Sequence, residues 1–192
     1  MTWAQSLDAN YTDAIIVLHK GRVVYERYMG VMRPRSPHMA MSVTKSMFGT
    51  LGAMLLAEGK LDANALVTRY IPELAGSGWA DATVRQVLDM TTGLKYSENY
   101  ADPQAEVWQH ARAGGILPRP PGYEGPRSFY EFLRTVPKDG EHGQAFAYKT
   151  VNTDVLGWLI RRATGQTVGE VLSERIWQKL GAEQDAYLLI DS

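Results

Sequence analysis

The 192-residue sequence contains no cysteine. Disulfides, thiol nucleophiles and thiolate metal sites are therefore excluded, and nothing ties the chain to an oxidising compartment. An excess of basic side chains is also missing, because 20 Lys and Arg stand against 21 Asp and Glu, for a formal net charge of −1. Without surplus positive charge to neutralise phosphates, nucleic acid is not an expected partner.

The sequence also lacks a long hydrophobic run. The longest mostly apolar stretch, 47–57, contains glycine and is too short to cross a bilayer. The first residues carry no basic segment followed by an apolar one, which is the pattern of a secretory signal. We therefore expect no membrane partner and a cytoplasmic location. The 45% of hydrophobic residues is enough to bury a core, so we expect one folded domain over 1–192.

The first forty residues predict a hairpin and a loop. The runs 13–19 and 22–28 are rich in β-branched and aromatic residues, and a Lys-Gly pair separates them. Two prolines within 32–37 then exclude further strand. Because an isolated hairpin is marginal in water, it needs additional strands, and the apolar run within 186–192 is predicted to begin one.

The region 41–185 is predicted to be helical. Apolar residues recur at helical spacing, with capping residues before them and glycines after them, at about 43–58, 66–70, 83–90, 129–135, 154–163 and 168–180. The helix over 43–58 has a broad apolar face and is expected to be central and well buried. The segment 114–127 holds four glycines and four prolines and is predicted to be a long surface loop.

Metal and nucleotide chemistry find no support in the sequence. The four histidines, His19, His38, His110 and His142, are scattered and are interpreted as structural or surface residues. No HExxH, GxGxxG, GxxxxGK[ST] or GxSxG pattern occurs. We expect no metal and no cofactor.

The remaining chemical motif is Ser42-Val43-Thr44-Lys45. Residues three apart face the same side of a helix, so the hydroxyl and the ammonium are neighbours there. A lysine can activate a serine nucleophile, and helix N-terminal N–H groups can bind an oxyanion. On the motif alone, a serine that merely caps a helix with a lysine in its first turn is the favoured explanation. The context adds Tyr148 in a polar turn before a helix, which offers a phenol as a proton shuttle beside Lys45.

Several ordered segments then resemble a known family. The hairpin, the SxxK motif, 83–94 (TVRQVLDMTTGL), the Tyr148 turn and Ala163-Thr-Gly165 are similar to the serine β-lactamase/penicillin-recognising superfamily, closest to its class C-like branch. Within that branch, 89–106 and 152–154 resemble 6-aminohexanoate-dimer hydrolases and related carboxylesterases. The resemblance implies an α+β, β-lactamase/transpeptidase-like fold with an antiparallel sheet, partial in this chain, and a large helical region.

The resemblance also implies roles for four residues. Ser42 would be the acylated nucleophile, Lys45 its activating partner, and Tyr148 the general base and acid. Tyr100 would bind substrate by contacting its amide; a rim aromatic without a role is the equal alternative. Thr150 stands where the broader family has the asparagine of Tyr-x-Asn, which counts against β-lactam turnover, and Asn152 is the nearby candidate to substitute for it.

The sequence lacks the third motif of this family, Lys-Thr-Gly or His-x-Gly on a strand, and family members are about twice as long. We therefore expect a C-terminal part to be missing, the 192-residue chain alone to be nearly inactive, and either that segment or a homo-oligomer as its protein partner.

The implied function is a serine hydrolase that cleaves small linear amides or short-chain esters through an acyl-enzyme, without cofactor. Two alternatives stay open. One is a β-lactamase or D-Ala-D-Ala peptidase, and the other is a truncated, non-catalytic binding module.

Overall fold

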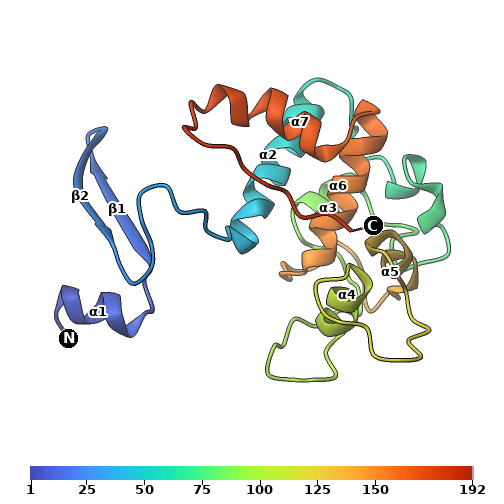
Figure 1. Cartoon of the computed structure of the whole chain (residues 1–192). Helices are drawn as coiled ribbons and strands as arrows, with labels where there is room; N and C mark the ends of the chain where they lie inside the picture. The colour runs from blue at the N-terminus through green and yellow to red at the C-terminus, as the bar shows by residue number, and fades with distance from the viewer. Residues whose placement is uncertain (192) are drawn as a thin grey trace. The chain divides into compact units, whose positions relative to one another are not determined.

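The computed structural model describes residues 1–191, and the chain divides into two compact units, Met1–Met41 and Ser42–Ser192 (Figure 1). The single domain expected over 1–192 stays a prediction. Ser192, the end of the strand expected at 186–192, lies outside the described residues.

The N-terminal unit begins with a helix that the sequence analysis missed, α1 (Trp3–Ala9). Its N-terminus carries a capping box: the Gln5 N–H donates to Thr2 Oγ1 at 3.2 Å, and the Thr2 N–H donates to Gln5 Oε1 at 2.7 Å. Thr-x-x-Gln is a known signature of a helix start. The local sequence therefore contained the signal for α1.

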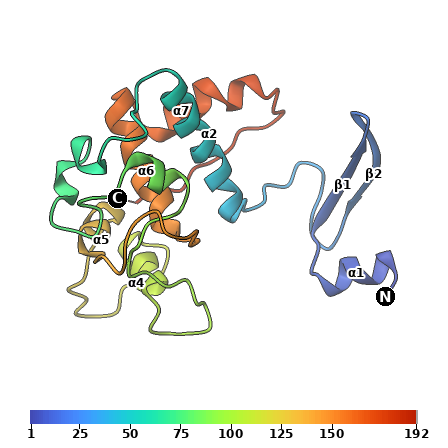
Figure 2. The same ribbon diagram turned by 180° about the vertical axis from the view of Figure 1, so that it is seen from behind.

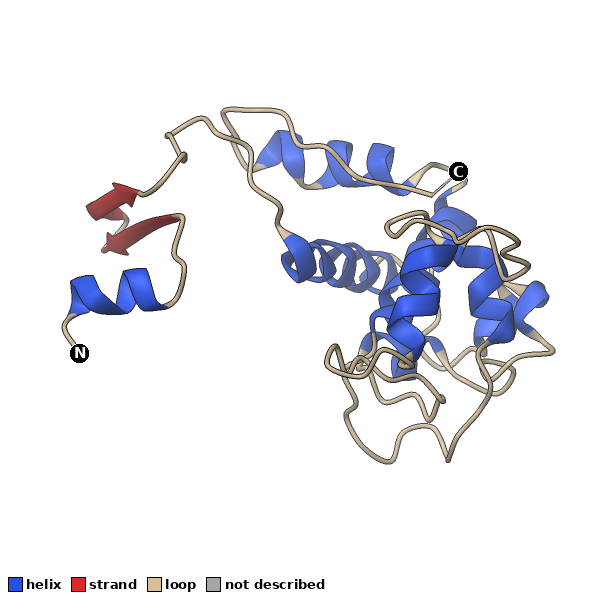
Figure 3. Cartoon of the chain, turned by 60° about the horizontal axis from the view of Figure 1, so that its bottom comes forward, coloured by secondary structure: helices blue, strands red, loops and turns tan. Residues whose placement is uncertain are grey.

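The hairpin was predicted correctly. Strand β1 (Ala14–His19) pairs antiparallel with β2 (Arg22–Tyr28), and both turn residues have positive φ, 49° at Lys20 and 75° at Gly21. Such a turn matches the right-handed twist of the two strands. Among the described residues these are the two strands of the molecule (Figure 3). Apolar side chains on both of them are exposed, namely Ile16, Val17, Leu18, Val23 and Val24.

The second unit is helical. Its α-helices are α2 (Thr44–Ala57), α3 (Val84–Leu88), α4 (Glu106–Ala113), α5 (Phe129–Thr135), α6 (Thr150–Thr164) and α7 (Val168–Arg175). Short 3₁₀ turns lie at Met41–Val43, Val67–Arg69, Pro72–Leu74 and Trp177–Lys179. No helix in the described part of the chain is both long and apolar enough to span a membrane.

The central buried helix is α6 rather than the helix expected over 43–58. Helix α6 buries nine of the ten residues from Val151 to Ile160, all except half-buried Asp154, whereas α2 buries three, Leu51, Gly52 and Leu55. Helices α2 and α7 lie beside α6 in both views (Figures 1 and 2). The apolar content of α2 is high, but its first two turns lie at the edge of the core and stay partly exposed.

Helix α6 also begins earlier than predicted. The sequence favoured Thr153 as the cap of a helix starting at 154, but the helix starts at Thr150 and Thr153 is buried inside it. The residue before the helix, Lys149, provides no side-chain cap. A distant carboxylate takes that role instead, because Glu98 Oε1 accepts the Thr150 N–H. Local sequence patterns do not reveal a cap of this kind.

Two further predictions concern irregular segments. Residues 114–127 form neither helix nor strand, as expected of a surface loop. Residues 186–191 form no strand, which corrects the expectation for this segment. A strand needs a neighbouring strand for its ladder hydrogen bonds, and no described strand pairs with this segment. The segment is held instead by Asp191, whose Oδ2 accepts the Phe129 N–H at 2.6 Å.

Candidate active site

Ser42 and Lys45 meet at the start of α2. Ser42 lies exposed in the 3₁₀ turn that precedes α2, and Lys45 lies half-buried in the first α-helical turn. The Lys45 Nζ donates a hydrogen bond to Ser42 Oγ at 3.0 Å. Met41, directly before the serine, has φ 46°, in the left-handed region that residues with a Cβ rarely adopt. This strained residue turns the chain into the helix at Ser42.

Tyr148 contacts the same lysine. The Lys45 Nζ lies 5.1 Å from the centroid of the Tyr148 ring, which is the geometry of a cation–π contact. The Tyr148 side chain is half-exposed. The three side chains predicted to carry the chemistry are therefore brought together around the Lys45 ammonium.

The turn that carries Tyr148 is fastened to the segment 90–98. The Ala147 N–H donates to the carbonyl of Met90 at 2.8 Å. Lys149 Nζ donates to the carbonyls of Thr92, at 3.3 Å, and of Leu94. Burial of Lys149 lowers the pKa of its ammonium, and nearby Asp139 partly offsets that effect. Lys149 thus acts as an anchor that holds its neighbour Tyr148 toward α2.

Asn152 is poorly placed to replace the missing asparagine of the Tyr-x-Asn motif. Its side chain is 1% exposed, and its Oδ1 accepts the Thr92 hydroxyl at 2.8 Å. The amide oxygen is therefore engaged at the junction between 90–98 and α6, while Nδ2 is buried without a hydrogen-bond partner among the described residues. This burial counts against Asn152 as the substitute for that asparagine, which stays a prediction.

Tyr100 and Tyr148 are linked by a residue that the sequence analysis did not single out, Glu98. Its Oε1 accepts the Thr150 N–H, and its Oε2 accepts the Tyr100 hydroxyl at 3.1 Å. Burial raises the pKa of the Tyr100 phenol, and the charge of Glu98, the hydrogen bond to it and the nearby Tyr148 raise it further. The sequence held no signal for this role, since an exposed-looking Glu in a polar loop is ordinary.

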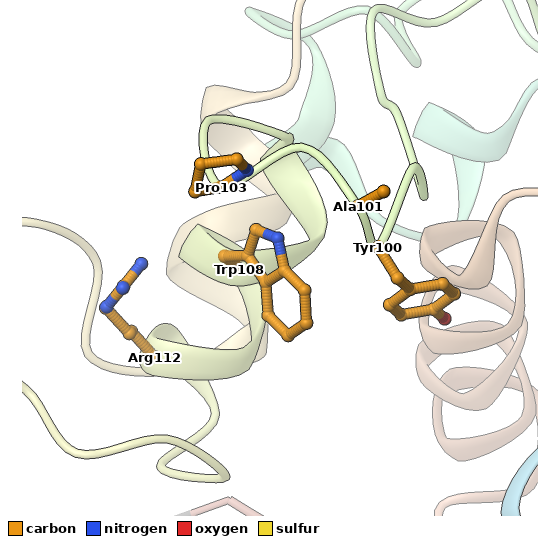
Figure 4. Close-up of a pocket in the computed structure, with 5 residues that line it drawn as sticks. All are labelled: Tyr100, Ala101, Pro103, Trp108 and Arg112. Atoms are coloured by element: carbon orange, nitrogen blue, oxygen red, sulfur yellow. The ribbon is translucent and has the colours of Figure 1, made fainter.

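Tyr100 also forms one wall of an open hollow of about 210 Å³. Figure 4 shows the rings of Tyr100 and Trp108 beside it, with Arg112 at its edge. The two rings meet edge to face, with centroids 5.7 Å apart. The hollow offers apolar ring surface and one cation, which suits an aliphatic chain with a polar end.

The buried histidines serve the structure around the site. His110 Nδ1 lies 3.1 Å from the Tyr96 hydroxyl, and its Nε2 lies 2.8 Å from Asp154 Oδ2, although that contact lacks hydrogen-bond alignment. His142 Nδ1 accepts the Gly93 N–H at 2.9 Å. Within residues 1–191, no group of three or more His, Asp or Glu side chains could hold a metal ion.

Comparison with known proteins gives a consistent result. The Beta-lactamase family model matches residues 4–187. The chain is 43% identical to a 6-aminohexanoate-dimer hydrolase of Paenarthrobacter ureafaciens, over 97% of this chain and 47% of that protein. It is 29% identical to the esterase EstB of Burkholderia gladioli, over 86% and 44% of the two chains.

A solved structure agrees with these relatives. The Bacillus anthracis protein assigned as a 6-aminohexanoate-dimer hydrolase superposes with a TM-score of 0.91 at 34% identity, covering 100% of this chain and 50% of that one. The chain therefore spans about half the length of the relatives it matches.

Proposed function

Since the chain belongs to the Beta-lactamase family, we propose that it is the nucleophile-bearing part of a serine hydrolase that cleaves small linear amides or short-chain esters. The observation that carries the proposal is the 3.0 Å hydrogen bond between Lys45 Nζ and Ser42 Oγ at the start of α2. Of the two groups, the serine supplies the nucleophile and the lysine its proton acceptor.

The reaction follows from this arrangement in two steps. Ser42 Oγ attacks the substrate carbonyl, and its proton passes to Lys45 in the neutral form of that lysine. Tyr148, which packs against Lys45, returns a proton to the leaving amine or alcohol as the scissile bond breaks. Water then attacks the acyl-serine and loses a proton to the same pair, and the pair returns a proton to Ser42 Oγ as the acid is released. The N–H groups at the start of α2 are the oxyanion donors that this part of the chain offers.

The names of the relatives narrow the class of substrate that we propose for this chain. By its name, the Paenarthrobacter relative hydrolyses a dimer of 6-aminohexanoate, a linear amide, and EstB is an esterase. The hollow beside Tyr100 and Trp108 fits an extended aliphatic chain of that kind. We propose that Tyr100 contacts the scissile group and that the chain of the substrate lies along these rings.

Peptidase and β-lactamase activities are the less favoured assignment. Relatives described as D-alanyl-D-alanine carboxypeptidases reach 24% identity, and a β-lactamase matches over 36% of this chain. Thr150 occupies the place of the asparagine in Tyr-x-Asn, and the burial of Asn152 counts against it as a replacement. The site therefore lacks a polar group on which β-lactam turnover in this family depends.

Covalent labelling tests the assignment and separates a hydrolase from a binding module. A fluorophosphonate should label the peptide that contains Ser42, and Ser42→Ala should abolish that labelling while the fold persists. Ser46, one helical turn further on and exposed, is the matched control, and Ser46→Ala should label normally. Labelling that persists in Ser42→Ala would show that the nucleophile has been assigned wrongly.

A further inference from the structure

Glu98 uses both carboxylate oxygens inside the candidate site. One oxygen accepts the backbone N–H of Thr150, and the other accepts the hydroxyl proton of Tyr100. Glu98 is itself half-buried, and the loop behind it is fixed because the Ser97 N–H donates to Glu106 Oε2 at 3.0 Å. The carboxylate therefore stands between the substrate-side phenol and the turn that carries Tyr148.

The direction of the hydrogen bond from the Tyr100 hydroxyl to Glu98 matters for substrate recognition. An ionised carboxylate can only accept, so the bond to Glu98 consumes the one proton of the Tyr100 hydroxyl. The remaining lone pairs of that oxygen can only accept a hydrogen bond. Tyr100 is 62% exposed beside the hollow, so this oxygen is open to an incoming group.

We propose that Glu98 is a positioning residue that fixes Tyr100 as a hydrogen-bond acceptor for the N–H of the scissile amide, and thereby sets the preference for amides over esters. The inference rests on the proposed function and adds a specificity determinant to it. An amide presents an N–H beside the carbonyl that Ser42 attacks, whereas an ester presents only an oxygen. A phenol held as an acceptor therefore favours the amide and gains nothing from the ester.

Replacing Glu98 with glutamine should reverse this polarity. Glutamine has one carbonyl acceptor and one NH₂ donor. Because the Thr150 N–H requires the acceptor, the NH₂ group must face Tyr100 and donate to it. The O–H of Tyr100 then points toward the substrate. There the hydroxyl and the amide N–H are both hydrogen-bond donors, so they cannot pair. The shape of the side chain hardly changes, so the turn and the helix start are retained.

The test compares a matched pair of substrates with the same acyl group, a 4-nitroanilide and a 4-nitrophenyl ester. Glu98→Gln should lower kcat/KM for the anilide about tenfold relative to the ester, which corresponds to one hydrogen bond. Tyr100→Phe should lower the same ratio by a similar factor. Glu183→Gln is the control, because Glu183 is exposed and has no hydrogen bond or ion pair in the described part of the chain, and it should leave the ratio unchanged.

A second readout does not depend on turnover. The absorbance of the Tyr100 phenolate, taken as the difference from Tyr100→Phe, should titrate at lower pH in Glu98→Gln than in the parent, and at the parent value in Glu183→Gln. Equal losses on anilide and ester, or an unmoved Tyr100 titration, would overturn the role of Glu98. Absence of Ser42 labelling in the protein completed by the C-terminal segment expected to be missing would instead contradict the proposed function, so the two failures are distinguishable.

Discussion

At the scale of single residues, the Lys45 ammonium is the centre of the site. It donates to Ser42 Oγ on one side and lies over the Tyr148 ring on the other. The contact with Tyr148 is made by the ring face, not by the hydroxyl. The packing contact and the proposed proton transfer therefore involve different parts of the same tyrosine, and a substitution can separate them.

Tyr148→Phe separates these two contributions. The ring and its contact with the ammonium remain, while the proton of the phenol is removed. We expect fluorophosphonate labelling of Ser42 to slow by about 10²–10⁴, the usual contribution of general acid–base catalysis. The midpoint of urea unfolding should change little. A variant that unfolds readily but labels at the parent rate per folded molecule would make Tyr148 a packing residue.

The residues of the candidate site differ in how far the sequence could predict them. The proximity of Ser42 and Lys45 follows from helix geometry alone, since three positions make less than one turn. Tyr148 was predicted from the polar turn that carries it and from the family resemblance, Tyr100 from the resemblance alone, and their catalytic and binding roles stay predictions. Glu98 was missed because its partners include the N–H of Thr150, which lies 52 positions away and carries no side-chain signal.

At the scale of elements, α2 and α6 approach each other through glycines. A Cβ on Gly52 of α2 would lie 2.9 Å from a methyl of Leu156 and 2.8 Å from a methyl of Leu88. A Cβ on Gly157 of α6 would lie 3.0 Å from the ring of Phe48. The close approach keeps the start of α2 near the turn that precedes α6. The geometry of the site therefore depends on these small residues.

Two glycines of α2 provide a matched test of this packing. Gly52→Ala should destabilise the fold by about 1–3 kcal/mol, the usual cost of overpacking a core. Gly49→Ala should stabilise it by about 0.5–1 kcal/mol, because no atom lies within 4 Å of the added methyl and alanine is the better helix former. Urea unfolding measures both. Equal effects at the two positions would contradict the close packing of α2 on α6.

The exposed carboxylate of Asp81 links its own segment to the segment that carries Lys138 and His142. Asp81 accepts from Lys138 Nζ at 2.5 Å, and its other oxygen lies 3.1 Å from His142 Nε2. The hydrogen bond from Lys138 lowers the pKa of Asp81 below its ordinary value, and the charges of His142 and Lys138 act in the same direction. Because the folded pKa is the lower one, the stabilisation is complete above the unfolded value of about 3.9 and is lost as the pH falls through the folded value.

Acid unfolding tests the Asp81 contacts. The melting temperature of the parent should fall between pH 5 and pH 2 more steeply than that of Asp81→Asn, and the two curves should converge at the acid end. Asp81 is largely exposed, so we expect a small difference. Glu124 in the 114–127 loop, for which no ion pair is found in the described chain, supplies the control Glu124→Gln, which should keep the slope of the parent. Parallel curves for parent and Asp81→Asn would show that these contacts contribute nothing.

The start of a helix was predicted correctly where a side chain just before the helix caps it. Ser128, Thr83 and Thr167 each accept an N–H three residues on, and the helices behind them were predicted with nearly correct starts. Helix α4 was missed because the residue before it, Ala105, has no capping side chain. The start of α6 was placed wrongly because its cap comes from Glu98, in a distant loop.

At the scale of the whole molecule, the chain has the β-lactamase/transpeptidase-like fold, and the family predicted from its motifs is confirmed. The two-stranded sheet in the N-terminal unit exposes apolar side chains on β1 and β2, as described above. Exposed strand edges with apolar side chains readily pair with another chain. The sequence predicted this hairpin, but its exposure depends on which other strands are present.

Association through the hairpin is therefore expected. The 192-residue chain should elute from size-exclusion columns at a volume that decreases with rising concentration, and Leu18→Lys with Val24→Lys should restore monomeric elution. Val31→Lys with Met39→Lys adds the same two charges at residues that are 89% and 66% exposed but lie outside both strands, and this control should not restore monomeric elution. Association that persists in the strand variant would exclude the hairpin as the contact.

The hydrogen bonds between the segment 90–98 and the region around the Tyr148 turn have a consequence for the order of folding. Their partners lie 52 to 60 positions apart, as in the pairs Thr150 with Glu98 and Thr92 with Asn152. Contacts of such long range form late, because a large loop must close first. During synthesis the site cannot assemble until residue 152 has left the ribosome. In pulsed hydrogen exchange, the amide of Thr150 should gain protection after those of α2, so the candidate site would assemble only after α2 has formed.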